Sequence, residues 1–200
     1  MELKSVIESR RSIRKFLPDP IPEEYINAIL DAARMAPSGA NIQPWRFVII
    51  KSPGAREKLN DFTLGFVANA PVIIVCCSDL SAEGAKGERL RELSKAGAFE
   101  GIIYDMPKST NQKVRKVNED QLQGYINQNT AIAVEHMILR ATDLGLGSCW
   151  VMMFNRKELA SWLQLENNLY PFCLLPIGFA DQTPLPRPRK KLNELVVKVI

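Results

Sequence analysis

Four short runs of mostly hydrophobic residues constrain the fold of this chain more than any other feature. They occupy residues 45–52, 70–78, 148–154 and 172–180. Apolar runs of this length are typical of buried β-strands and are far too short to span a bilayer. We therefore expect these four strands to form the centre of the molecule.

Helical patterns lie before, between and after these runs. They predict helices over residues 2–10, 22–36, 53–62, 120–145 and 155–165. Asn155 is placed to cap the last helix, and Gly145 and Gly147 are placed to end the longest one. The expected buried face of that long helix consists of Ile126, Thr130, Val134, Met137, Ile138, Ala141 and Leu144. Strands that alternate with helices indicate an α/β or α+β fold, without setting the strand order.

Length and charge exclude several classes of protein. Two hundred residues fit one domain, 1–200, with a sizeable core. A net charge of +4 is too small to suggest a nucleic-acid-binding protein. The charged start of the chain does not resemble a signal peptide, so we expect a cytoplasmic protein with no membrane partner.

The four cysteines show no metal-ligand spacing, and we expect buried thiols in a reducing compartment and no metal site. A catalytic cysteine would need His136 as its partner, but His136 lies in the middle of a predicted helix, where we expect a local hydrogen bond. The polar segment 81–119 breaks the pattern of strands and helices. It is either a solvated flap or a lid over a site.

A cluster of basic residues follows the first helix, in a stretch made extended by three prolines. Arg10, Ser12 and Arg14 alternate along this stretch, so their side chains project to one side. Two guanidinium groups and a hydroxyl suit a phosphate, although such a cluster can also be a solvated surface. Arg187 and Arg189 repeat the pattern near the C-terminus, within a proline-stiffened segment.

Taken together, five motifs resemble the FMN-dependent nitroreductase family over nearly the whole chain. In order they are "RRSIRKF", "AARMAPSGANIQPWRFVII", "GLGSCWV", "LPIGFAD" and "PRPRKKL". The resemblance implies an α+β fold, an α/β sandwich whose central mixed or antiparallel sheet is flanked by helices. It also implies an intertwined homodimer with FMN at the interface. The "VMM" that follows "SCW" departs from the proline- and glycine-rich stretch of some members, so no subfamily is assigned.

The resemblance further implies which residues bind FMN. It nominates Arg10, Arg11, Ser12 and Arg14, with Arg187 and Arg189 closing on the phosphate. The loop of Pro37, Ser38, Gly39 and Asn41 would reach the flavin from the second subunit. The strand of Cys149, Trp150, Val151 and Met152 would run behind the ring and present a backbone N–H to N5 or O4. Trp45 and Trp150 fit the core equally well.

No side chain in these motifs is a clear acid, base or nucleophile, so we nominate no catalytic residue. The resemblance implies that NADH or NADPH reduces the flavin, which then reduces a nitroaromatic, a quinone or a similar small acceptor. The alternatives are other chemistry on the same fold, such as reductive dehalogenation or flavin fragmentation, and a non-enzymatic flavin or phosphate-ligand binder. The apolar tail at 190–200 is unfavourable in water, and we expect it to cover the neighbouring subunit.

Overall fold

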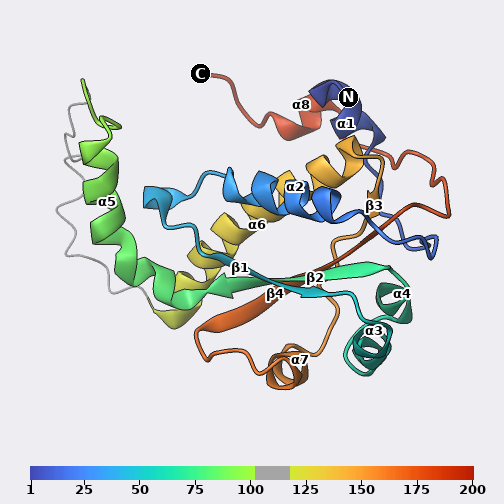
Figure 1. Ribbon diagram of the computed structural model, residues 1–200. Coiled ribbons are helices and arrows are strands. Elements are labelled where there is room, and N and C mark those ends of the chain that lie inside the picture. Colours follow the sequence, from blue (N-terminus) through green and yellow to red (C-terminus); the bar gives the residue numbers. More distant parts are fainter. Residues whose placement is uncertain (102–117) are drawn as a thin grey trace.

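A twisted antiparallel sheet runs through the middle of the computed structural model, which describes residues 1–101 and 118–200 (Figure 1). Within these residues the sheet has four strands in the order β1-β2-β4-β3. The strands are β1 (Trp45–Ile50), β2 (Val72–Asp79), β3 (Gly147–Ser148) and β4 (Leu169–Gly178). Three of the four hydrophobic runs therefore form strands where the sequence predicts them.

Helices cover both faces of the sheet, as Figure 1 shows. On one face lie α2 (Glu23–Arg34) and α6 (Glu119–Asp143); on the other lie α3 (Pro53–Lys58), α4 (Gly65–Ala68) and α7 (Arg156–Trp162). Every residue of β2 is buried, and its side chains alternate between the two cores. Ile74 and Cys76 belong to the core under α2 and α6, whereas Ile73 and Val75 belong to the opposite one.

The long helix α6 follows its predicted pattern. Asn118 and Gln121 form a capping box at its start, and Gly145 has the positive φ of 78° that follows its end. Six of the seven residues on its expected face are buried, and Leu144 packs partly buried against the same core. The helix at the start of the chain, α1 (Leu3–Ser9), and the Asn155 cap of α7 are also confirmed.

The predicted strand at 148–154 is wrong in its extent. Regular pairing covers only Gly147–Ser148, although Val151 still bridges Leu174 in the same register. Between these points the Cys149 N–H donates to the carbonyl of Pro176 at 3.3 Å. Proline has no N–H to return that bond, so the ladder is interrupted there.

The hydrogen bond of His136 differs from what the sequence predicts, and the segment 81–119 is described only in part. His136 does not make a local hydrogen bond, because its Nδ1 lies 3.3 Å from the carbonyl oxygen of Ala32 on α2. The expected lid at 81–119 begins with a short 3₁₀ helix, η3 (Leu80–Ala85), and helix α5 (Lys86–Lys95). Its residues 102–117 lie outside the described part of the chain.

The four thiols are buried and free, as expected. Burial, with a smaller contribution from the neighbouring Cys76, raises the pKa of the Cys77 thiol to about 12. Among the helices of residues 1–101 and 118–200, none has both the length and the hydropathy to cross a bilayer.

A buried carboxylate fastens the end of β2. Asp79 accepts hydrogen bonds from Ser81 and from Asn168 Nδ2 at 2.8 Å, and its other oxygen lies 3.0 Å from Arg46. Burial raises the pKa of Asp79, but these hydrogen bonds and the Arg46 charge outweigh it, so the net pKa is lowered. The ionised form is thus the one that the fold favours.

We expect Asp79→Ala to lower the free energy of unfolding by about 1–3 kcal/mol at pH 7, because it leaves partly buried donors unpaired. Because the folded pKa is the lower one, the contribution of Asp79 is complete above its unfolded pKa and is lost as pH falls through the folded value. In urea unfolding, the difference in the free energy of unfolding between Asp79→Ala and the wild type should therefore be smaller at pH 3 than at pH 7. Asp61→Ala, at an exposed helix pair with Lys58, is the control and should show little gap at either pH.

Candidate cofactor site

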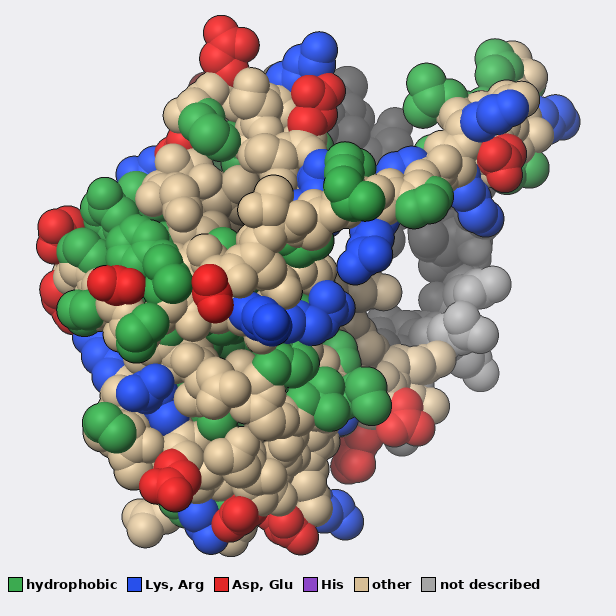
Figure 2. Space-filling model, turned by 90° about the vertical axis from the view of Figure 1, so that its right-hand side faces the viewer, with side chains coloured by type: hydrophobic (Ala, Val, Ile, Leu, Met, Phe, Trp, Pro, Cys, Tyr) green, Lys and Arg blue, Asp and Glu red, His purple; other side chains and the backbone are tan. Residues whose placement is uncertain are grey.

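Basic side chains from both ends of the chain meet at one cavity of about 330 Å³. One wall comes from the segment after α1 and the other from the segment after β4. The lining residues are Arg10, Arg11, Ser12, Arg14, Pro184, Arg187 and Arg189. Figure 2 looks onto this side of the molecule and shows Lys and Arg side chains gathered near its middle.

Most of these guanidinium groups have no acidic partner. Within the described residues, no carboxylate lies within 4.0 Å of Arg10, Arg14, Arg187 or Arg189. Arg14 has only an aromatic neighbour, with its guanidinium 6.0 Å from the centre of the Phe66 ring. Like charges held together without counterions favour binding of an anion.

Arg11 differs from the other arginines. Its Nη1 donates to the carbonyls of Glu8 and Arg10, at 2.6 and 2.8 Å. These carbonyls lie at the C-terminal end of α1, where a cation is favourable. The main role of Arg11 is therefore to cap the C-terminal end of α1, and its side chain lies at the edge of the cavity.

Cys149 lies beside this cavity. Burial raises the pKa of its thiol, while Arg14, Arg10 and a hydrogen bond with Ser12 oppose that effect. The thiol is therefore protonated at neutral pH and is a poor nucleophile. The bridge between Ser12 and Ser148, directly before Cys149, places this segment beside the basic residues.

The segment after β3 has one edge paired and one edge open. The Cys149 and Val151 N–H groups donate to β4, at 3.3 and 2.9 Å. Successive N–H groups of an extended chain point to opposite edges, so those of Trp150 and Met152 point away from β4. In the described chain neither has a hydrogen-bond partner. Ile13 donates to Ser148 at 2.9 Å on that same edge, so the open donors continue the line along which Ser12 and Arg14 lie.

The side chains of this segment divide between core and surface. The Trp150 ring packs edge-on against Phe172, with centroids 5.6 Å apart, and Val151 is buried. Met152 is 42% exposed. Trp45 is buried in the core, which resolves the alternative left open for it in favour of packing.

The predicted loop of Pro37, Ser38, Gly39 and Asn41 is not brought to the arginine cavity. It joins α2 to β1 and lies against α6, on the opposite side of the molecule from the two basic segments (Figure 1). None of its residues lines the cavity. Within one chain, therefore, the nominated residues form two separate groups.

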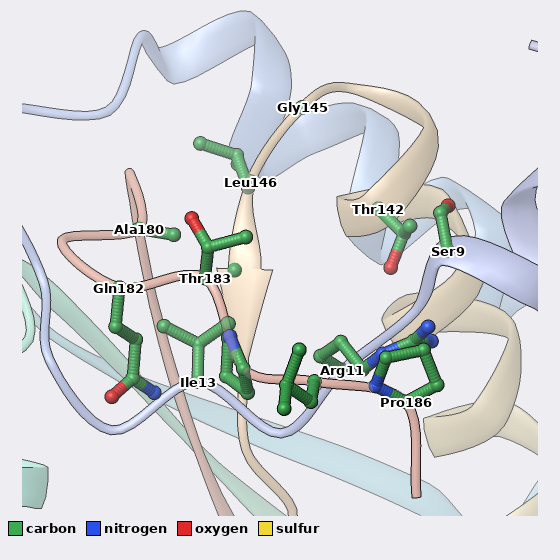
Figure 3. A pocket seen from close by; sticks show the side chains of 13 residues that line it. Ser9, Arg11, Ile13, Thr142, Gly145, Leu146, Ala180, Gln182, Thr183 and Pro186 are labelled. Carbon is green, nitrogen blue, oxygen red and sulfur yellow. The ribbon is translucent and has the colours of Figure 1, made fainter.

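A second cavity, of about 470 Å³, adjoins the first and shares Arg11 and Pro184 with it. Figure 3 shows mostly apolar or uncharged side chains around it, among them Ile13, Leu146 and Thr183. Gly147 lines this cavity as well. A Cβ at position 147 would lie 2.7 Å from Ile13, so glycine is needed there for the N-terminal segment to approach β3. We assign no chemistry to this cavity.

Sequence reasoning missed two residues near these sites. Phe66, the neighbour of Arg14, lies in a short helix with no motif to mark it. Asn129 donates and accepts hydrogen bonds at the base of the Ser38–Gly39 loop. The sequence does contain a signal for Asn129. It is a polar residue on the buried face of the helix at 120–145, and a buried polar side chain needs a hydrogen-bond partner.

Comparison with known proteins agrees with this architecture. Residues 7–179 match the model of the nitroreductase family. The chain is 28% identical to an NADH dehydrogenase from Thermus thermophilus, over 98% of this chain and 96% of that protein. It is 26% identical to a 4-nitrobenzoate reductase from Pseudomonas putida, over 90% of this chain and 86% of that one.

Among solved structures, a candidate nitroreductase from Exiguobacterium sibiricum in complex with FMN has the same fold. The TM-score is 0.81 at 22% identity, and the match covers 100% of this chain and 98% of that one. The family match covers most of the chain, including three of the four nominated segments and the whole sheet. This chain belongs to the nitroreductase family of oxidoreductases.

Proposed function

We propose that this protein is an FMN-dependent oxidoreductase that takes electrons from NADH or NADPH and passes them to a small acceptor such as a nitroaromatic compound or a quinone. The observation that carries the proposal is a group of four guanidinium groups, none with an acidic partner within the described residues, beside the unpaired N–H groups of Trp150 and Met152. The names of two relatives and the FMN complex of a structural neighbour support it.

The residues present fit FMN. Arg187 and Arg189, on the C-terminal side of the cavity, suit the phosphate because guanidinium groups pair with its oxygens in a bidentate fork. Arg10 and Arg14 suit the electron-rich edge of the ring, since arginine stays charged as negative charge grows there. Of the four residues nominated to present a backbone N–H to the ring, Cys149 and Val151 already donate theirs to β4. Only the N–H groups of Trp150 and Met152 are therefore available for the flavin.

When bound, FMN supplies the redox chemistry, accepting hydride from the nicotinamide and delivering electrons to the acceptor. The chain supplies binding, orientation and electrostatics. Its arginines hold positive charge where reduction adds negative charge, and its backbone donors need no particular side chain. The Cys149 thiol beside the arginines has a raised pKa and is therefore a poor nucleophile at neutral pH.

We further propose that two copies of the chain form each site. The Pro37–Asn41 loop lies away from the arginine cavity in its own chain, so it can complete only the site of a partner. The tail offers an apolar surface for such a partner: Leu192, Leu195, Val196, Val197, Val199 and Ile200 are each 55% exposed or more. Figure 2 shows hydrophobic side chains on an arm that stands away from the body of the molecule.

The direct test of the function is spectroscopic. We expect the purified protein to be yellow, to bleach when mixed anaerobically with NADH or NADPH, and to regain its colour on addition of a nitroaromatic acceptor. Protein that is colourless and takes up no added FMN would contradict the proposal. Flavin that binds but is reduced by neither nicotinamide would instead favour a non-enzymatic flavin-binding protein.

A further inference from the structure

The loop between α2 and β1 has an unusual backbone. Ala40, Asn41 and Gln43 have positive φ angles of 51°, 54° and 45°. Among the residues that the structure describes, only one other non-glycine residue, Gln164, has a positive φ. Such conformations are uncommon for residues other than glycine and asparagine, and strained backbone positions cluster at functional sites.

The contacts within the loop are short-range. Ser38 Oγ accepts a hydrogen bond from the Gln43 N–H at 3.0 Å, and the side chains of Asn41 and Gln43 are 3.2 Å apart. Ile42 anchors the end of the loop in a small core with Ile126. These hydrogen bonds lie within the loop. They do not fix the position of Gly39 relative to the rest of the molecule.

Asn129 of α6 provides that contact. Its Oδ1 accepts from the Gly39 N–H at 2.7 Å, and its Nδ2 donates to the Tyr125 carbonyl at 2.8 Å. Asn129 is 5% exposed but Gly39 lies at the surface, so the two hydrogen bonds are partly buried. Because the amide is held by its own helix, its oxygen is aimed at one point of the loop.

From these contacts we infer that Asn129 is a positioning residue that holds the strained Ser38–Gln43 loop in its flavin-binding shape. The inference rests on the proposed function, in which this loop completes the FMN site of a partner subunit. Without Asn129 the Gly39 N–H loses its buried acceptor, and the positive φ angles at Ala40 and Asn41 are no longer imposed. The loop then relaxes, and flavin binds a site that is correctly shaped for only part of the time.

Asn129→Ala is the test, and Thr130→Val is its matched control. Thr130 is the next residue on α6, is fully buried, and bonds Ser78 at 2.9 Å rather than the loop. We expect Asn129→Ala to weaken FMN binding by about tenfold in a fluorescence titration, as for the loss of one partly buried hydrogen bond. Thr130→Val should lower the melting temperature but leave the FMN Kd within about twofold of wild type.

A second variant separates positioning from general stability. Glycine tolerates the backbone angles of position 40 better than alanine does, so adding Ala40→Gly to Asn129→Ala should recover part of the lost affinity. Amide hydrogen exchange of the flavin-free protein gives a readout that needs no cofactor. It should be faster across residues 38–43 in Asn129→Ala and unchanged in β2 and β4.

Three results would overturn the inference. They are wild-type FMN affinity in Asn129→Ala, equal weakening in Asn129→Ala and Thr130→Val, and unchanged exchange in the loop. If the wild-type protein binds no FMN, the proposed function fails and the flavin role of the loop fails with it. The exchange measurement still decides in that case whether Asn129 holds the loop.

Discussion

Replacing Arg14 and Arg189 together with alanine is expected to lower FMN affinity by about 10²- to 10⁴-fold. Each substitution removes a charge-assisted partner, which costs about 1.5–3 kcal/mol. In the proposed site the two residues contact different parts of the cofactor, Arg14 the ring edge and Arg189 the phosphate, and neither has an acidic partner within the described residues. Their costs should therefore add, and 1.4 kcal/mol corresponds to a factor of ten.

Titration of the flavin-free protein with FMN, followed by fluorescence quenching, measures this effect. The matched control is Arg34→Ala combined with Arg89→Ala, which removes the same charge from exposed helix pairs. We expect that control to bind FMN within about threefold of wild type, because exposed pairs contribute little. If the Arg14 and Arg189 variant stays within tenfold of wild type, these residues do not hold the cofactor.

Removing residues 192–200 is expected to convert a dimer into a monomer. Six large apolar side chains of this tail are exposed in the single chain, and an obligate dimer buries at least about 2,000 Å². Truncation removes that apolar surface while leaving Arg187 and Arg189 in place. FMN uptake should fall as well, since in the proposed site the loop at 37–41 reaches the flavin from the partner subunit.

Size-exclusion chromatography with light scattering tests the truncation at micromolar concentration. The full chain should have twice its 22.5 kDa mass, and the truncated chain should have the mass of a single truncated chain. Val197→Asp should weaken the dimer and Lys198→Ala should not, because only the first buries an unpaired charge at an apolar contact. A full-length monomer would contradict the two-copy site.

The fold was largely predictable because its strongest signals are local. The helix at 120–145 shows its buried face through spacing alone, and the runs at 70–78 and 172–180 are too apolar to be anything but core. The strand at 148–154 failed for a non-local reason. Pro176, on a different strand, lacks the N–H that would have continued the ladder, and the register that brings it opposite Cys149 cannot be seen in the sequence.

The site was only partly predictable for a similar reason. Sequence motifs nominated arginines by type and spacing, and the structure brings those of both chain ends to one cavity. Motifs could not show that Arg11 is engaged by the carbonyls of α1, or that His136 reaches Ala32 on another helix. They also could not separate the N–H groups that already donate to β4 from those of Trp150 and Met152, because this depends on strand pairing.

The arginine-lined cavity couples the stability of the two ends of the chain. In the proposed site, an anion bound between the first and last segments would link the two ends of the polypeptide non-covalently. A ligand that binds only the native state stabilises it by an amount that rises with the ligand concentration, so fraying of either terminus and loss of the anion are coupled. A protease cut in the C-terminal segment should therefore also loosen the N-terminal segment, although the two are separated by nearly the whole chain.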